Sequence, residues 1–195
     1  MAATYERLWS TLTSELPGSI PASVRLALSN TINEFCRESR AWREQVEVTL
    51  EVDKTRYVVA AHDALIVEAY TISHPTLNFA RAFYKEGAVT LFEFPTSRDI
   101  PYPLLVYCAL APLPPALDQT DISALLPVDI WNDHEATLYA GTMARMMMQP
   151  LKPYTNPQLA VAHRRDFFMK AAEARVRATK LDAEYGQTWH FPRFA

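Results

Sequence analysis

The chain has 195 residues, of which 49% are hydrophobic, and this is enough for one domain with a buried core, or for one domain that carries an insertion. Its formal net charge of −3 argues against a general nucleic-acid-binding protein, which would carry a strong basic excess. Its 4 glycines argue against a glycine-rich phosphate-binding loop. Composition therefore excludes a disordered chain and leaves the function to be inferred from the order of the elements.

The cysteines and the first residues of the chain indicate the cellular compartment in which the protein is made. Cys36 and Cys108 are the only cysteines, and a pair in a chain of this length makes no disulfide framework, so we expect buried, reduced thiols. Residues 1–7 lack a basic patch followed by an apolar run, and no apolar stretch approaches the ~18 residues that a membrane span needs. We therefore expect a protein that is made in the cytoplasm and is neither secreted nor inserted in a membrane.

Two short helices are expected at the start of the chain. Over residues 5–16 apolar side chains recur at helical spacing, and Pro17-Gly18 ends the pattern. Over residues 21–40 a second apolar stripe follows the same period. Its members are Val24, Leu28, Thr31, Ile32 and Phe35.

After Trp42 the hydrophobic period changes to two. Val46, Val48, Leu50 and Val52 alternate with polar residues, which predicts a half-exposed strand. Further strand-like runs follow at 57–59, 65–72, 76–84, 88–94 and 104–110, with turn residues between them. Short strands with frequent turns predict an antiparallel sheet or small sandwich over about 45–112, and the prolines that follow predict an irregular link up to Pro127.

Two longer helices are expected over 128–149 and 157–185. Asn156-Pro157 between them offers an N-cap followed by proline at the first helical position, so the pair should form a helical hairpin. The first helix has two apolar stripes, which predicts neighbours on both sides. They consist of Ala136, Ala140, Met143, Ala144 and Met147, and of Trp131, Leu138 and Met148. The second helix has one cleaner face, formed by Phe167, Ala171, Ala174, Ala178, Leu181 and Tyr185.

This order predicts an α+β protein in which a β lobe is inserted into a helical bundle. The four helices are expected to pack together, because short helices are marginal alone and need tertiary burial. Residues 1–44 and 127–185 would form the bundle, 45–126 the inserted antiparallel lobe with its proline-rich link, and 186–195 an extended C-terminal arm.

No stretch of the chain carries a recognisable catalytic, cofactor or metal motif. Asp133-His134-Glu135 begins like a zinc-binding H-E-x-x-H, but position 138 is Leu, and adjacent residues diverge by about 100° on a helix. Cys108 lies in an apolar strand pattern and Cys36 near the end of a helix, so we interpret both as core thiols. An enzyme would need a site that carries no such motif, so we predict no enzyme, no metal and no cofactor.

Two clusters allow a binding interpretation beside a structural one. Met146-Met147-Met148 could form an adaptable surface, although core filling is the more common use. The basic residues of the last helix could contact DNA, but Asp166 and Glu173 stand four residues before Lys170 and Arg177, as on a solvated helix face. We favour the structural interpretation of both.

The last residues are unusually aromatic. Trp189, Phe191 and Phe194, with His190 and Arg193, fall where chains are normally polar and frayed. Trp, Phe and Arg are typical anchors of protein interfaces. The segment either folds back over its own bundle or docks on a partner, and the alternatives are equal on the residues alone.

The order of the elements resembles a known family. Phe35-Cys36-Arg37-Glu38-Ser39-Arg40-Ala41-Trp42, leading directly into the alternating strand, is similar to the end of the N-terminal helical pair in head-to-tail connector (adaptor) proteins of tailed bacteriophages, the tail-tubular-protein-A-like group of short-tailed phages. Leu126-Pro127, the helix through Met146, the Pro150 to Asn156 segment and residues 160–177 resemble the rest of that layout. The resemblance covers most of the chain.

The resemblance implies a structural virion protein. Such proteins form a dodecameric ring beneath the portal protein, join it to the tail nozzle, and leave a channel through which double-stranded DNA passes without specific binding. It therefore implies the portal, the nozzle or tail-tube protein and further copies of the chain as partners, and the candidate portal-docking arm is Trp189, His190, Phe191, Arg193 and Phe194. Alternatives are a tail terminator or head-completion ring protein, and a small enzyme or regulatory module with a site in the β lobe.

Overall fold

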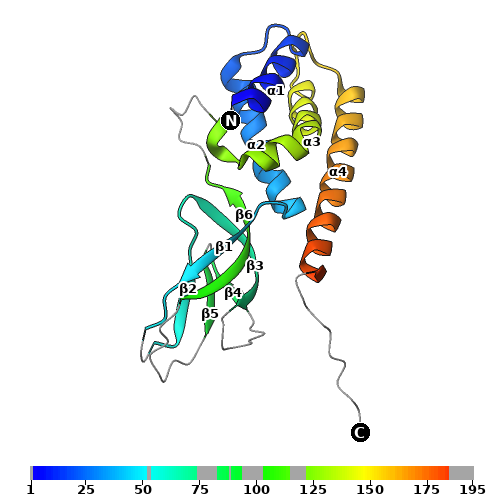
Figure 1. Ribbon diagram of the computed structural model, residues 1–195. Coiled ribbons are helices and arrows are strands. Elements are labelled where there is room, and N and C mark those ends of the chain that lie inside the picture. Colours follow the sequence, from blue (N-terminus) through cyan, green and yellow to red (C-terminus); the bar gives the residue numbers. More distant parts are fainter. Residues whose placement is uncertain are drawn as a thin grey trace.

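The computed structural model describes residues 2–51, 54–73, 83–87, 89–93, 103–114 and 122–184. Within these residues the chain forms four α-helices, one short 3-10 helix at Ser123–Leu125 and two small antiparallel sheets, which confirms the predicted α+β class. Figure 1 shows the helices gathered at one end of the molecule and the strands at the other. The division into a bundle (1–44 and 127–185), an inserted lobe (45–126) and an arm (186–195) stays a prediction.

The first two helices end where their sequence signals predict. Helix α1, Ala2–Glu15, stops before Gly18, whose φ of 74° is readily adopted by glycine. Helix α2, Pro21–Ser39, begins with proline at its first turn and ends at Arg40, which has a φ of 54°. The Arg40 N–H donates to the Cys36 carbonyl at 3.0 Å, and this bond turns the chain from the helix toward the first strand.

The strands form two three-stranded antiparallel sheets. One has the order β1-β6-β3 and the other β2-β5-β4. The strands are β1 Arg43–Val48, β2 Arg56–Val59, β3 Ala64–Ser73, β4 Phe83–Glu86, β5 Val89–Glu93 and β6 Leu104–Pro112. The Val46 and Val48 side chains are buried as the alternation predicts, but β1 stops at Val48, so the expected strand to Val52 is too long. Most of the expected 76–84 strand lies outside the described residues. Its last two positions belong to strand β4, Phe83–Glu86.

The junction between helices and sheets is held by polar contacts. The Leu110 N–H donates to the Trp42 carbonyl at 2.8 Å, and the Asn33 amide donates to the Pro112 carbonyl at 3.1 Å. Arg40 and Glu68 form an ion pair at 2.6 Å between the end of α2 and strand β3. These contacts fix the entry and exit of the β region on α2.

The C-terminal helices form the predicted hairpin. Helix α3, Val128–Met147, is followed by α4, Pro157–Glu184, and the Leu159 N–H donates to Asn156 Oδ1 at 3.1 Å, as expected of an N-cap. Two members of the predicted α3 stripes are wrong. Ala136 is exposed although Trp131 before it and Thr137 after it are buried, and Met148 is 55% exposed because the helix ends at Met147.

Helix α3 is central among the helices, where it contacts α1, α2 and α4. Both α2 and α4 come close to it at Gly141: a Cβ atom there would lie 2.4 Å from Thr31 Cγ2 of α2 and 2.6 Å from Phe167 Cδ2 of α4. Thr31, Gly141 and Phe167 are all buried. The absence of a side chain at Gly141 therefore lets α2 and α4 meet on one turn of α3.

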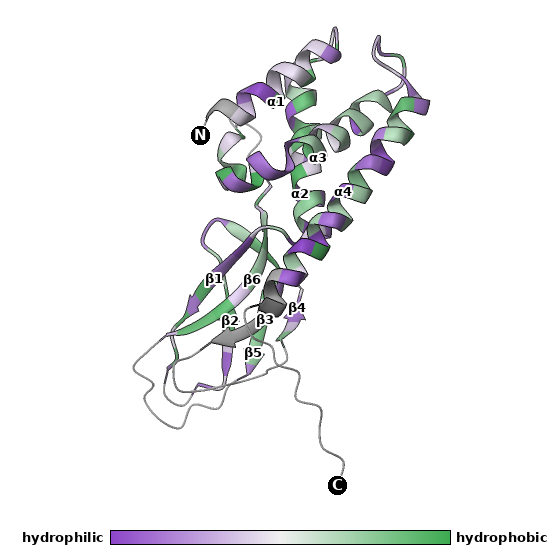
Figure 2. Ribbon diagram, turned by 45° about the vertical axis from the view of Figure 1, so that its right-hand side comes forward, coloured by the Kyte–Doolittle hydropathy of each residue, from purple (hydrophilic) through white to green (hydrophobic). Residues whose placement is uncertain are grey.

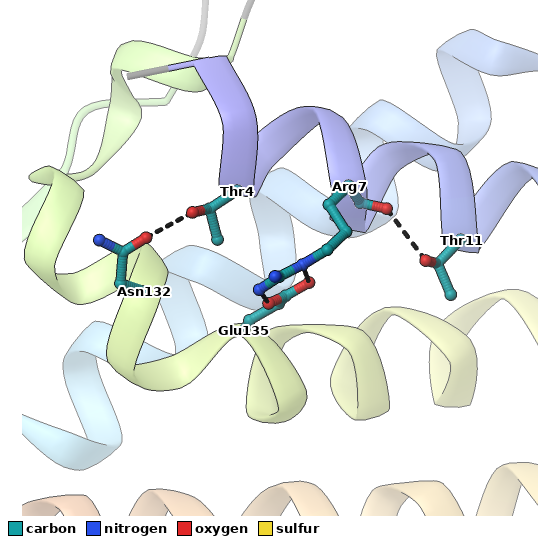
Figure 3. Close-up of polar contacts among 5 residues, drawn as sticks. All are labelled: Thr4, Arg7, Thr11, Asn132 and Glu135. Carbon is teal, nitrogen blue, oxygen red and sulfur yellow. Dashed lines mark hydrogen bonds and ion pairs between the residues drawn. The ribbon is translucent and has the colours of Figure 1, made fainter.

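Side-chain pairs join α1 to the first turns of α3. The Arg7 guanidinium donates two hydrogen bonds to the Glu135 carboxylate, one of them from Nε at 2.9 Å. One helical turn earlier on α1, Thr4 contacts Asn132 (Figure 3). Both pairs are exposed, so they contribute little to the stability of the protein. Their main effect is to align α1 on α3. The apolar contact beside them is the Tyr5 ring against Trp131, with centroids 5.6 Å apart.

Helix α3 is kinked at His134, which the sequence did not predict. His134 has φ −123° and ψ 16°, outside the helical range, while the residues on either side are helical. Its half-buried ring lies against Phe35 of α2, with centroids 4.7 Å apart. Burial lowers the pKa of His134 below its usual value; nearby Asp133 opposes this shift and Arg177 adds to it.

Gly141→Ala should destabilise the protein, because the new methyl group overlaps Thr31 and Phe167. We expect a loss of about 1–3 kcal/mol in the free energy of unfolding, measured by urea denaturation. Adding Thr31→Ser, which removes the closest methyl group, should recover part of the loss. The control on the same helix is Ala136→Gly, an exposed position, where helix propensity alone should cost about 1 kcal/mol. A Gly141→Ala protein as stable as the parent would contradict the close crossing.

Stability should fall as the pH drops below about 6.5, because the unfolded chain then protonates the His134 imidazole while the folded protein, with its lowered pKa, does not. The loss should end once the pH passes the folded pKa. Urea unfolding of the parent and of His134→Gln at several pH values measures this, and the variant should lack that part of the slope. His62→Gln, which changes a 99% exposed side chain, should keep it. Equal slopes for the parent and His134→Gln would refute the assignment.

Candidate interaction surface

Helix α4 has two apolar faces, only one of which is covered. The covered face packs on α2 and α3 and consists of Ala160, Phe167, Ala171, Ala174 and Ala178. The first four of these belong to the helical core, and the burial of Phe167, Ala171, Ala174 and Ala178 confirms the sequence prediction for them.

The uncovered face, here called the α4 stripe, consists of Val161, Phe168, Met169 and Val176. Their exposed fractions are 62%, 38%, 51% and 54%. At about 100° per residue, the stripe lies roughly 140° around the helix from the covered face. Figure 2 shows hydrophobic segments interspersed with hydrophilic ones along α4. Isolated exposed valines are ordinary, but four large apolar side chains on one side of one helix form a patch.

The α4 stripe is bordered by cations. Arg165 lies within it, and Arg164 and Arg175 border one side; all three side chains are exposed. The Arg164 guanidinium lies 5.6 Å from the centroid of the Phe168 ring, in cation–π geometry. On the other side Asp166 is neutralised by Lys170 at 2.7 Å, which leaves Glu173 as the nearest carboxylate within α4. The stripe is therefore apolar with a net positive border.

A pocket opens beside the N-terminal end of the stripe, between α3 and α4. Its volume is about 330 Å³. It is lined by Gly141, Ala144, Arg145 and Met148 of α3 and its C-cap, by Ala160, Val161, Arg164, Phe167 and Phe168 of α4, and by Glu34 of α2. Because Val161 and Phe168 belong to both, the pocket and the stripe form one continuous surface.

A second groove adjoins this pocket along α2. It has a volume of about 530 Å³, and Leu26, 61% exposed, Leu65 and Pro114 contribute its apolar lining. Glu34 and Arg145 line both depressions and form an ion pair with each other. This pair therefore separates the pocket from the groove.

The predicted arm lies outside the described residues. Trp189, His190, Phe191, Arg193 and Phe194 all follow Glu184, where the described part of α4 ends. Their role on the portal remains a prediction.

The residues considered for chemistry occupy separate structural positions. Glu135 pairs with Arg7, His134 packs on Phe35, and Asp133 is exposed (Figure 3 shows the Glu135 pair). In the described part of the chain no three His, Cys, Asp or Glu side chains lie close enough together to hold a metal ion.

The two thiols and the methionines are mostly core residues. Cys36 and Cys108 are buried, and burial raises the pKa of each to about 12, so neither thiol is ionised near neutral pH. Met143, Met146 and Met147 are buried among the helices. Met148 differs, since it is exposed and lines the pocket. The core interpretation of the cluster is correct for Met146 and Met147 and wrong for Met148.

The α4 stripe is the feature that the sequence analysis missed. The strongest apolar periodicity of residues 157–185 belongs to the covered face. The weaker periodicity of the α4 stripe was therefore overlooked. Val161, Phe168 and Val176 follow one another at spacings of seven and eight, which returns a helix to the same side each time. A second stripe at that spacing was therefore visible in the sequence.

Among the described residues, no helix combines the length and the apolar character that crossing a lipid bilayer requires. No known family model and no curated protein matches this chain.

Proposed function

We propose that this chain is a structural subunit of the ring that joins the portal to the tail nozzle of a tailed bacteriophage. The observation that carries the proposal is the α4 stripe, a second apolar face on a helix whose first face is already buried. A patch of this kind marks a protein–protein contact. The resemblance of the chain to head-to-tail connectors supplies the type of assembly.

A ring subunit needs more covered surface than an isolated domain does. Each copy has two neighbours, and in a head-to-tail ring the two contact faces differ. The groove that contains Leu26 and Leu65 can serve a neighbouring copy and the α4 stripe another protein of the virion, and each has apolar side chains that the subunit itself leaves uncovered. Their presence favours an interaction protein over a small enzyme.

In this proposal the four helices act as one bundle and the β region as an inserted lobe. The modest net charge of −3 suits a channel through which double-stranded DNA slides, because bound phosphates would resist movement. The protein would be made in the host cytoplasm and reside in the virion at the head–tail interface. It would act without a cofactor and without catalysis, in contact with portal and nozzle proteins.

The arm is the proposed link to the portal. Trp189, Phe191 and Phe194 each offer more than about 100 Å² of surface for burial, and His190 and Arg193 add polar contacts. Repetition of a weak contact around the ring makes attachment strong through effective concentration.

The assembly test compares the purified chain alone and with the portal protein of the same phage, by light scattering and negative-stain microscopy. Ring-shaped particles of several copies are expected with the portal present. Val176→Glu in the stripe should prevent them, because it places a charge in the contact. The matched control is Val58→Glu, since Val58 and Val176 are both 54% exposed. Compact monomers under both conditions would contradict the proposal.

The arm test deletes residues 187–195. Thermal melting should change little, while attachment to portal-bearing heads in a pull-down should be lost. A full-length variant with Trp189→Ala, Phe191→Ala and Phe194→Ala should behave like the deletion, which separates side-chain contacts from chain length. A truncated protein that unfolds would assign the segment to its own bundle, and one that attaches normally would leave it without a docking role.

A further inference from the structure

The charges around the α4 stripe restrict what can cover it. Two stripes from different copies would place cations against cations: an antiparallel pair centred near Lys170 sets Arg165 opposite Arg175, and a parallel pair sets each arginine opposite itself. Like charges this close repel each other, the more so when their surroundings lose water. The stripe is therefore unsuited to pairing with its own copy.

The shape of the surface indicates the form of the missing partner. Val161 and Val176 are 15 residues apart, so the stripe is about 22 Å long, the length of four helical turns. It lies along one α-helix, whose backbone groups are bonded within the helix, so it offers no edge to an added strand. A row of side chains of this length is the surface against which another helix packs.

The pocket between α3 and α4 supplies a place for one anchoring side chain. Ala144, Met148, Val161 and Phe168 give it an apolar lining, and exposed Arg145 and Arg164 also border it. A volume of about 330 Å³ accepts a large apolar side chain. Anchors in such pockets carry much of the affinity of an interface.

We propose that the α4 stripe and the adjoining pocket bind an amphipathic helix whose apolar face is bordered by carboxylates. Leucine-like or aromatic side chains of that helix cover Val161, Phe168, Met169 and Val176, and its carboxylates pair with Arg164, Arg165 and Arg175. The inference rests on the proposed function in one respect: the helix belongs to another protein of the virion.

A protein partner fits the surface better than phosphate does. DNA would engage the arginines but leave the four apolar side chains in water, whereas contacts to phosphate need no apolar row. A lipid surface would cover the stripe but leave the pocket without an anchor. An acidic amphipathic helix can cover the apolar side chains, pair with the arginines and place an anchoring side chain in the pocket.

The test measures binding of the full chain to a fluorescent synthetic peptide by anisotropy. The peptide has about 18 residues and is designed as an amphipathic helix with leucines on one face and glutamates along both borders. The control peptide carries lysine in place of each glutamate. We expect the glutamate peptide to bind at least about tenfold more tightly, with the difference shrinking as salt rises from about 0.05 M to about 0.5 M.

Variants of the chain distinguish this site from nonspecific attraction. Val161→Ser with Val176→Ser should weaken the glutamate peptide about tenfold without changing the thermal melt, because both side chains are exposed. The combined change Arg164→Glu, Arg165→Glu and Arg175→Glu should invert the preference, so that the lysine peptide binds better. Arg177→Glu, the same change on another side of α4, should leave the preference unaltered.

Several results would overturn the proposal: no binding of the glutamate peptide, equal binding of both peptides, or no inversion in the triple variant. Duplex DNA or phosphatidylserine vesicles that bind while the glutamate peptide does not would assign the basic border to phosphate instead. These measurements need no portal protein. Failure of peptide binding with intact ring assembly would therefore refute only this inference, and the reverse outcome would refute only the ring.

Discussion

The packing of three helices around Gly141 is the constraint on which the rest of the structure depends. Thr31 of α2 and Phe167 of α4 both reach the space that a side chain at Gly141 would fill. Because Asn33 of α2 and Trp42, just after its end, are both bonded to strand β6, the crossing sets where this sheet begins relative to the helices. It also fixes the rotation of α4, since Phe167 must point inward and Phe168 then faces outward.

That rotation connects packing to the proposed role. A helix with two apolar faces can bury either one, and the choice determines which remains available to other molecules. The face with Phe167, Ala171 and Ala174 fits closely against α3, because the two alanines are small and Phe167 packs over Gly141, which has no side chain. The face with Val161, Phe168 and Val176 is bulkier and bordered by arginines, so it is left for a partner that brings its own side chains and charges.

Much of the fold was predictable because its signals are local. Pro17-Gly18 and Asn156-Pro157 mark helix boundaries through backbone chemistry, and the covered face of α4 follows from helical period. The kink at His134 was not predictable, because helical period does not report the non-helical dihedral angles of His134 or the contact of its ring with Phe35, about a hundred residues earlier in the chain. Met148 was misjudged for a related reason: periodicity does not show that the helix ends one residue before it. For the candidate surface, the sequence contained the spacing of the α4 stripe but not which of two apolar faces the fold would cover.

The two buried thiols can report whether the helical part and the β part of the molecule open together or separately. Cys36 belongs to the hydrophobic cluster of the helices and Cys108 to the cluster between the sheets, so each core contains one thiol of its own. A thiol shielded from solvent reacts with an alkylating reagent only when its surroundings open. The alkylation rate of Cys36 thus measures how often the helical core opens, and the alkylation rate of Cys108 measures how often the β core opens. If the two rates agree, the chain opens as a single cooperative unit; if they differ, one part loosens while the other stays closed.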